Sequence, residues 1–204
     1  KLAHSANAAA DIEFRFPFGF KEVEGVHSRT DFDLDRHEEF SGKKIRYYDA
    51  ETGESYIPYV IETSIGVDRM VLQVLSAGYQ EEKLENGEER TVLSIPAPLA
   101  PVKAAVLPLV KKDGLPEIAH RIKNTLRYDY NIQYDEKDSI GKRYRRQDAI
   151  GTPLCITVDH QSAEDGTVTV RDRDTMRQER VNIEAIPALV ESKAGMRALL
   201  DKLA

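Results

Sequence analysis

Two hydrophobic periodicities follow one another in the first half of the chain. Residues 59–65 alternate between apolar and polar side chains and are rich in β-branched and aromatic types. This pattern predicts a β-strand that carries Glu62 and Ser64 on one face. After Gly66 the apolar positions follow a helical period through residue 75. They surround the segment on nearly all sides, so we expect this helix to be buried.

Two charged residues open the predicted helix. Asp68 falls in the first turn, where the exposed backbone N–H groups favour a carboxylate. Arg69 follows it and carries a planar guanidinium fork that suits phosphate. The spacing also allows a buried ion pair between Arg69 and Glu62 that only orders the junction. The residues alone leave both interpretations open.

The residues before this segment predict further strands of an antiparallel sheet. Residues 11–16 and 22–27 alternate between polar and apolar types, and residues 31–37 have the composition of a polar helix start. Residues 41–55 predict a polar insertion with its own turn, which joins two strands of one antiparallel sheet.

Glu22 and Glu24 lie on one face of the predicted strand at residues 22–27. Two carboxylates at this spacing can hold a metal ion, but an exposed strand face that carries acids is the commoner outcome. The pattern does not choose between them.

The pattern changes after a proline-rich segment. Residues 80–90 predict a charged loop with an Asn-Gly turn, and three prolines within residues 95–101 predict a stiff linker. From residue 102, short apolar strands alternate with amphipathic helices, which is typical of a small α/β sheet covered by helices. Strands are predicted at 102–109, 131–134, 154–158 and 167–171, helices at 115–128 and 140–150, a turn at 163–166, and a final helix through residue 203 after residues 180–183.

Composition narrows the class of protein. The chain has 204 residues, of which 41% are hydrophobic, enough for one large core or two small ones. It holds no apolar run of the roughly 20 residues that a membrane helix requires, and its first residues lack the order of a secretory signal. We therefore expect a cytoplasmic protein without a membrane partner. The single cysteine, Cys155, is expected in a buried strand, and the scattered histidines give no zinc site.

The net charge of −6 hides a local excess of positive charge, because residues 100–150 carry a net charge of +4. This section contains the basic run 142–146, in which four cations flank Tyr144. Such a run is usually a solvated helix face, and Asp148 could neutralise part of it. Cations combined with an aromatic ring are also what unstacked RNA bases pack on.

Three stretches resemble the class II aminoacyl-tRNA synthetases. Residues 61–69 (IETSIGVDR) look like motif 3 of this class, a strand and a glycine followed by an arginine in a hydrophobic helix. The acid, the serine and the Asp-Arg pair within this stretch resemble the glycyl-tRNA synthetases in particular. Residues 22–34 (EVEGVHSRTDFDL) and 139–148 (SIGKRYRRQD) are similar to the same family. The similarity extends over nearly the whole chain and points to the bacterial-type homodimeric form.

The resemblance implies an α/β and α+β architecture in two domains. Residues 1–98 are expected to be the C-terminal part of a class II catalytic domain, which is built on an antiparallel sheet and contains motif 3. Residues 99–204 are expected to be an α/β anticodon-binding domain with a mixed sheet flanked by helices. The chain shows no match to motif 1, which forms the dimer interface, or to motif 2, which supplies further adenylate-binding residues. We therefore expect a C-terminal fragment of a longer synthetase that does not form glycyl-adenylate alone.

The resemblance also implies a reaction and its binding residues. The family attaches glycine to tRNA(Gly) through glycyl-adenylate, with ATP and Mg²⁺ as substrates, no zinc, a homodimer as the working form and no covalent catalytic residue. The implied contacts are glycine at Glu62 and Ser64; ATP at Glu22, Val23, Gly66, Val67, Asp68 and Arg69; Mg²⁺ through ATP at Glu22; and tRNA at Lys142, Arg143, Tyr144, Arg145 and Arg146.

Two other functions remain as alternatives. One is a non-catalytic, synthetase-like RNA-binding accessory protein. The chain retains an acid that could bind an ammonium group, and this acid argues against that function. The other is a related class II ligase for threonine, proline or histidine, which the pair of Glu62 and Ser64 and the absence of zinc-ligand spacing disfavour.

Overall fold

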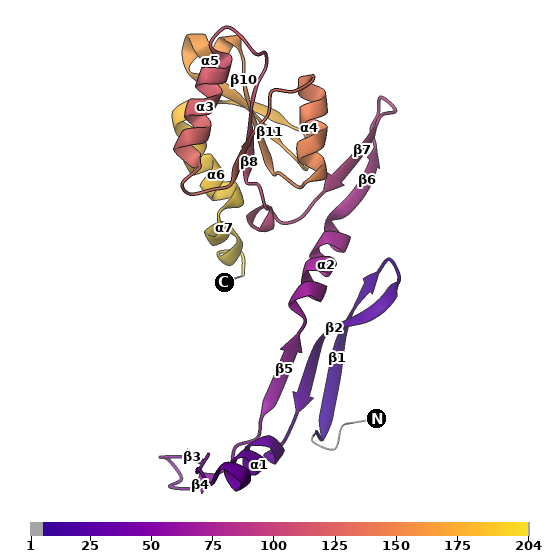
Figure 1. Cartoon of the computed structure of the whole chain (residues 1–204), viewed down its shortest axis with the longest axis vertical. Helices are drawn as coiled ribbons and strands as arrows, with labels where there is room; N and C mark the ends of the chain where they lie inside the picture. Colours follow the sequence, from indigo (N-terminus) through magenta and orange to yellow (C-terminus); the bar gives the residue numbers. More distant parts are fainter. Residues whose placement is uncertain (1–5, 204) are drawn as a thin grey trace. The chain divides into compact units, whose positions relative to one another are not determined.

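The computed structural model describes residues 6–203 and divides into two compact units, one up to Ser76 and one from Ala77 onward. Each unit has its own main sheet (Figure 1). Among the described residues, no helix is both long enough and apolar enough to cross a membrane.

The first unit is built on a three-stranded antiparallel sheet with the order β1-β2-β5 (Figure 1). The insertion between β2 and β5 contains a helix where the sequence predicts a polar helix start. It also contains a separate two-stranded hairpin around the predicted turn, and α2 follows β5 directly. The bounds are β1 Ala8–Phe16, β2 Gly19–Ser28, α1 Phe32–Ser41, β3 Tyr47–Tyr48, β4 Ser55–Tyr56, β5 Ile61–Ile65 and α2 Val67–Gly78.

The helix α2 forms where the sequence predicts it, but the expectation that it is buried is wrong. Val67 is 72% exposed and Val71 is 54% exposed, and among the described residues Gly78 is the only buried position of this helix. The described part of the first unit buries just two apolar side chains, Phe16 and Val23. The unit therefore offers no core that the helix could enter.

The second unit is a five-stranded mixed sheet with the order β12-β11-β10-β8-β9, preceded in the chain by the hairpin of β6 and β7 (Figure 1). The strands β9, β8 and β10 are parallel, whereas β11 pairs antiparallel with both β10 and β12. The bounds are β6 Tyr79–Lys83, β7 Glu89–Leu93, η1 Ala97–Leu99, β8 Ala104–Pro108, α3 Leu115–Leu126, β9 Ile132–Tyr134, α4 Ile140–Ala149, β10 Leu154–Val158, α5 His160–Asp165, β11 Thr167–Asp172, β12 Gln178–Asn182, η2 Ile183–Ala185, α6 Ile186–Ala194 and α7 Met196–Leu200.

Helices cover both faces of this mixed sheet, which explains why β8 and β10 are buried along their whole length. On one face, α3 and α6 pack Leu115 and Val190 against a core that includes Ile156. On the other face, α4 packs Tyr144 against a smaller cluster that includes Cys155. Cys155 is 1% exposed, as expected, and burial raises the pKa of its thiol to about 12.

Three local predictions differ from the structure. At residues 163–166 the sequence predicts a turn, but the helix α5 forms over His160–Asp165 and ends at Gly166. The sequence predicts a charged loop at residues 80–90, but β6 and β7 form a hairpin there, because Arg90 and Val92 alternate with exposed residues and enter the interior. The final helix is interrupted at Gly195, where an extended residue separates α6 from α7.

The division between the compact units lies before the predicted domain boundary at residues 98 and 99. The hairpin of β6 and β7 belongs to the second unit because β7 packs against α4, where Arg90 reaches Asp148. The domains at 1–98 and 99–204 remain a prediction.

Candidate functional site

A hollow of about 670 Å³ opens in the first unit where β2, β5 and α2 meet. Its lining contains every residue that the sequence predicts for glycine or ATP, except Glu62. The lining residues are Glu22, Val23, Ser64, Gly66, Val67, Asp68, Arg69 and Leu72. Two segments that are far apart in the sequence thus contribute to one concave surface.

A β-bulge directs Glu22 toward this hollow. The register between β1 and β2 shifts after Ile12, which leaves Val23 as an additional residue in β2. A bulge of this kind re-aims the neighbouring side chains. A Cβ atom built on Gly25 would lie 3.5 Å from Oε1 of Glu22, so the carboxylate lies on the face of Gly25. This placement separates Glu22 from Glu24, which the sequence pattern alone does not do.

Arg69 anchors the beginning of α2 to β2. Its Nη1 atom donates a hydrogen bond of 2.6 Å to the carbonyl oxygen of Glu22, and its side chain is otherwise exposed. The described residues contain no ion pair between Arg69 and Glu62, so the alternative of a buried pair at this junction does not hold. The other donors of the guanidinium fork remain available for an anionic ligand.

Glu62 lies on the same face of β5 as Ser64, beside the hollow but outside its lining. Its Oε2 atom is 3.1 Å from Nη1 of Arg29, and its Oε1 atom is 4.0 Å from Nδ1 of His27. Arg29 also binds Asp33 through Nε at 2.5 Å and through Nη2 at 2.9 Å. The guanidinium holds the pKa of Asp33 below its usual range. Glu62 is therefore held at the end of an ion-pair network.

Two residues of the basic run on α4 point into the second unit. Arg143 is 2% exposed and donates to the carbonyl oxygens of Pro108, Leu109 and Asp135 at 2.6, 3.2 and 3.2 Å. The hydroxyl of Tyr144 lies 2.7 Å from Oγ1 of Thr157, and Arg171 occupies one face of its ring at 4.8 Å. Arg143 thus connects the loops after β8 and β9, and the ring of Tyr144 is not free on both faces for a base.

The other three cations of the run lie toward solvent. Arg146 is bound by Asp135 at 2.6 Å and by Asp138 at 2.9 Å. Arg145 makes long contacts, 3.4 Å to Asp148 and 3.7 Å to Glu88, and no shorter ion pair with any described residue. Lys142 is exposed and has no ion-pair partner among the described residues.

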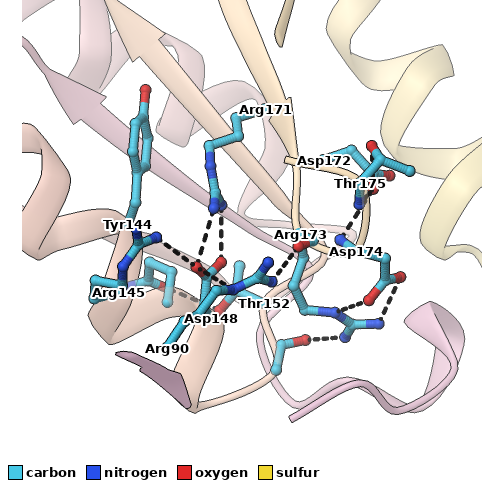
Figure 2. A network of polar contacts seen from close by, with 12 residues as sticks. Arg90, Tyr144, Arg145, Asp148, Thr152, Arg171, Asp172, Arg173, Asp174 and Thr175 are labelled. Atoms are coloured by element: carbon cyan, nitrogen blue, oxygen red, sulfur yellow. Dashed lines mark hydrogen bonds and ion pairs between the residues drawn. The ribbon is translucent and has the colours of Figure 1, made fainter. Parts of the chain in front are cut away.

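A buried network that the sequence does not reveal holds α4 in place (Figure 2). Asp148 is fully buried and accepts two hydrogen bonds from Arg171, at 2.8 and 3.0 Å. Arg90 of the hairpin adds a third contact to it, from Nε at 3.1 Å. Arg173 binds the carbonyl oxygens of Gly151 and Ile95 and the carboxylate of its neighbour Asp174. Arg171 pairs instead with an acid on another element.

Among the described residues there is no group of three or more side chains with the donors for a metal ion. Glu22 supplies one carboxylate at the hollow. One or two carboxylates are sufficient for Mg²⁺ when the remaining ligands are phosphate oxygens and water.

The second unit matches a known family of domains. Residues 103–193 match the family described as "Anticodon binding domain". Over 95% of its length the chain is 54% identical to the glycine–tRNA ligase of Chlorobaculum tepidum, 55% identical to that of Geobacillus kaustophilus and 51% identical to that of Borrelia hermsii. This chain is a homologue of the glycine–tRNA ligases. It spans 41%, 42% and 44% of the length of those three relatives.

The fold of this glycine–tRNA ligase homologue is also similar to that of a solved structure. The RNA-binding domain of threonyl-tRNA synthetase from Cryptosporidium parvum Iowa II superimposes with a TM-score of 0.65 at 20% identity, over 91% of this chain and 43% of that one. At that identity the similarity concerns the fold. The resemblance to the glycyl-tRNA synthetases and the predicted mixed sheet with flanking helices are therefore confirmed.

Proposed function

We propose that the chain is part of a glycine–tRNA ligase, in which the first unit binds glycine and ATP and the second unit binds tRNA(Gly). The main support is the shared hollow of the first unit, which combines an acid of β2 with the serine, glycine and Asp-Arg pair of the β5–α2 junction. Further support comes from the anticodon-binding family match and from relatives that are 51–55% identical.

The proposed reaction has two steps. The carboxylate of glycine attacks the α-phosphate of ATP to give glycyl-adenylate and pyrophosphate. A hydroxyl of the terminal ribose of tRNA then attacks the activated carbonyl group, and the bond from that carbonyl to the phosphate breaks, which gives glycyl-tRNA and releases AMP. The chain contributes positioning and charge stabilisation, with no covalent nucleophile. Glu62 and Ser64 receive the amino group of glycine, and the fork of Arg69 binds phosphate oxygens of ATP.

The ATP subsite is formed by both segments of the hollow. Glu22 takes part in holding Mg²⁺, which enters with ATP as substrate, while Val23, Gly66, Val67 and Asp68 shape the surface against the nucleotide. Rejection of larger amino acids rests on exclusion, because glycine has no side chain to bind. We propose a homodimer in the cytoplasm as the working form.

The second unit is proposed to bind tRNA through the outer face of α4. Lys142, Arg145 and Arg146 form this face, and the net charge of +4 between residues 100 and 150 supports an anionic partner. Arg143 and Tyr144 instead hold the helix against the sheet. The predicted contact of these two residues with RNA would therefore be indirect.

Glycine-dependent exchange of pyrophosphate into ATP tests the proposal. The complete gene product is expected to catalyse it, whereas the 204-residue chain alone is expected to be inactive and still to bind tRNA(Gly). Exchange by the isolated chain would contradict the expectation that it needs further segments. A complete gene product that binds tRNA but lacks exchange would identify an RNA-binding accessory protein. Exchange that depends on threonine, proline or histidine would identify a related ligase.

A further inference from the structure

An exposed histidine lies flat on a tyrosine in the second unit. The ring of His120, on α3, stacks on the ring of Tyr134, at the end of β9, with the ring centroids 4.1 Å apart and the ring planes inclined by 19°. His120 is exposed, and among the described residues its ring nitrogens have no hydrogen-bond or ion-pair partner. The imidazole therefore covers Tyr134 with one face and offers the other face to solvent.

Tyr134 supports this stack from below. It is half-buried and packs against the core between the sheet and α3. Its hydroxyl donates a hydrogen bond of 2.5 Å to Oε2 of Glu136. Burial and this bond raise the pKa of Tyr134, so the hydroxyl stays protonated as a donor. The ring beneath His120 is thus fixed in one orientation.

The loops beside the stack are also held in place. Arg143 donates to the carbonyl oxygens of Leu109 and Asp135, each at 3.2 Å, and so joins the loop after β8 to the loop after β9. Lys111 of the first loop lies 3.9 Å from Oε1 of Glu136 in the second. A ligand that binds here would find its surface already ordered, which lowers the entropic cost of binding.

We propose that the outer face of His120 is a stacking platform for an unpaired base of tRNA(Gly). Unstacked RNA bases pack on aromatic side chains, histidine among them, because every base has a π face. The inference rests on the proposed function. It adds a contact on α3 that the basic run of α4 does not contain and that no motif or charge pattern indicates.

The stacking platform and the basic face of α4 border the same loop. Asp135 directly follows Tyr134, and its carboxylate binds Arg146 of α4 at 2.6 Å. The strand β9 is at one end of the strand order, so no further strand of the mixed sheet lies beyond this loop. Phosphates at α4 and a base at His120 can therefore belong to one RNA strand.

The charges around the platform cancel. Glu117 and Lys123 lie three residues before and after His120, on the same face of α3. Lys111 and Glu136 form the second pair of opposite charges. A base at this position would be held by contact with the ring and not by charge. Loss of the ring should therefore leave the salt dependence of binding unchanged.

Binding of tRNA(Gly) to the 204-residue chain over a salt series tests the platform. His120→Ala should weaken binding at least about fivefold, with no change in the slope of log affinity against log salt. His120→Phe keeps a ring and should restore most of the affinity, whereas His120→Gln keeps a polar group without a ring and should resemble His120→Ala. Full affinity in His120→Gln, or a smaller slope in His120→Ala, would overturn the stacking role.

Tyr128→Ala is the matched control for removal of an exposed ring. Tyr128 is 80% exposed just beyond the other end of α3, and the ring has the guanidinium of Arg127 over it at 4.9 Å. This variant should change the affinity by less than about twofold. A loss as large as that of His120→Ala would show that any exposed ring contributes, and would overturn a specific site at His120.

A fully paired RNA duplex provides a second comparison, because its bases are already stacked on one another. The unchanged chain and His120→Ala should bind this duplex with equal affinity. A loss for the duplex equal to the loss for tRNA(Gly) would overturn the contact with an unpaired base.

The failure of the platform and the failure of the proposed function are distinguishable. If the unchanged chain does not bind tRNA(Gly), the proposed role of the second unit fails and the stacking platform fails with it. If the chain binds and the His120 variants behave like Tyr128→Ala, only the platform is overturned. Thermal unfolding identifies any variant that does not fold, and the comparison of His120→Phe with His120→Gln at equal stability then decides.

Discussion

Nε of Arg90, on the hairpin strand β7, lies 3.1 Å from Oδ2 of Asp148, on α4, and both side chains are fully buried (Figure 2). The same carboxylate binds Arg171 of β11 through both oxygens. One acid therefore joins three elements that are distant in the sequence. Asp148 therefore ties α4 to both β7 and β11.

Asp148→Asn is expected to destabilise the second unit by about 3–5 kcal/mol, because it leaves buried arginines without their common carboxylate. Chemical denaturation of the 204-residue chain, followed by circular dichroism, measures this loss. The control is Arg177→Met, because Arg177 is exposed and has no ion-pair partner among the described residues. We expect it to change the free energy of unfolding by less than about 0.5 kcal/mol. An Asp148→Asn chain as stable as the control would show that the network does not hold α4.

The ion pair of Asp159 and Arg180 stabilises the second unit at neutral pH, and this stabilisation is lost in acid. The hydrogen bonds from Arg180 are the main cause that lowers the pKa of Asp159 from 3.8 to about 2. A lowered folded-state pKa contributes stability above the unfolded value, and this contribution is lost as the pH falls from about 4 toward 2. Arg180→Gln should therefore be less stable than the original chain at pH 6, with the difference shrinking toward pH 2. Unfolding curves that differ by the same amount at both pH values would contradict this origin.

The outer face of α4 leads to a prediction about RNA. Lys142→Ala combined with Arg145→Ala should weaken binding of tRNA(Gly) to the chain and reduce the slope of log affinity against log salt by about 0.7–0.9 for each phosphate that the variant no longer neutralises. Filter binding over a salt series measures both quantities. Arg197→Ala, on the exposed helix α7, is the control for the removal of a surface cation elsewhere on the unit. Unchanged affinity and slope in the double variant would remove RNA from this face.

Much of the fold follows from local patterns. The fully apolar runs of β8 and β10 and the amphipathic period of α3 can be recognised without knowledge of their partners. The hairpin of β6 and β7 cannot be recognised in this way. Its residue Arg90 can be buried only because Asp148 on α4 pairs with it, and the sequence of the hairpin does not show that partner. The exposure of α2 likewise cannot be predicted from its own sequence, because that sequence is as apolar as the sequence of a buried core helix.

Some residues of the candidate site can likewise be predicted from the sequence, and others cannot. Ser64 and residues 66–69 are contiguous at a strand-to-helix junction, so their gathering at one hollow follows from the sequence. Glu22 joins them through a β-bulge, which no periodicity indicates. The spacing of Arg29 and Asp33 is typical of an ion pair on a helix, and it could have drawn attention to Arg29. Nothing in the pattern connects that pair to Glu62.

Glu62→Gln tests the central claim most directly, since it removes the charge of the acid proposed for the amino group of glycine and nearly preserves its shape. The measurement is glycine-dependent ATP–pyrophosphate exchange by the complete gene product, with the KM for glycine and for ATP determined separately. We predict that the KM for glycine rises at least about tenfold while the KM for ATP changes less than about twofold. An equal rise in both values, or no change in either, would contradict a glycine site at this carboxylate.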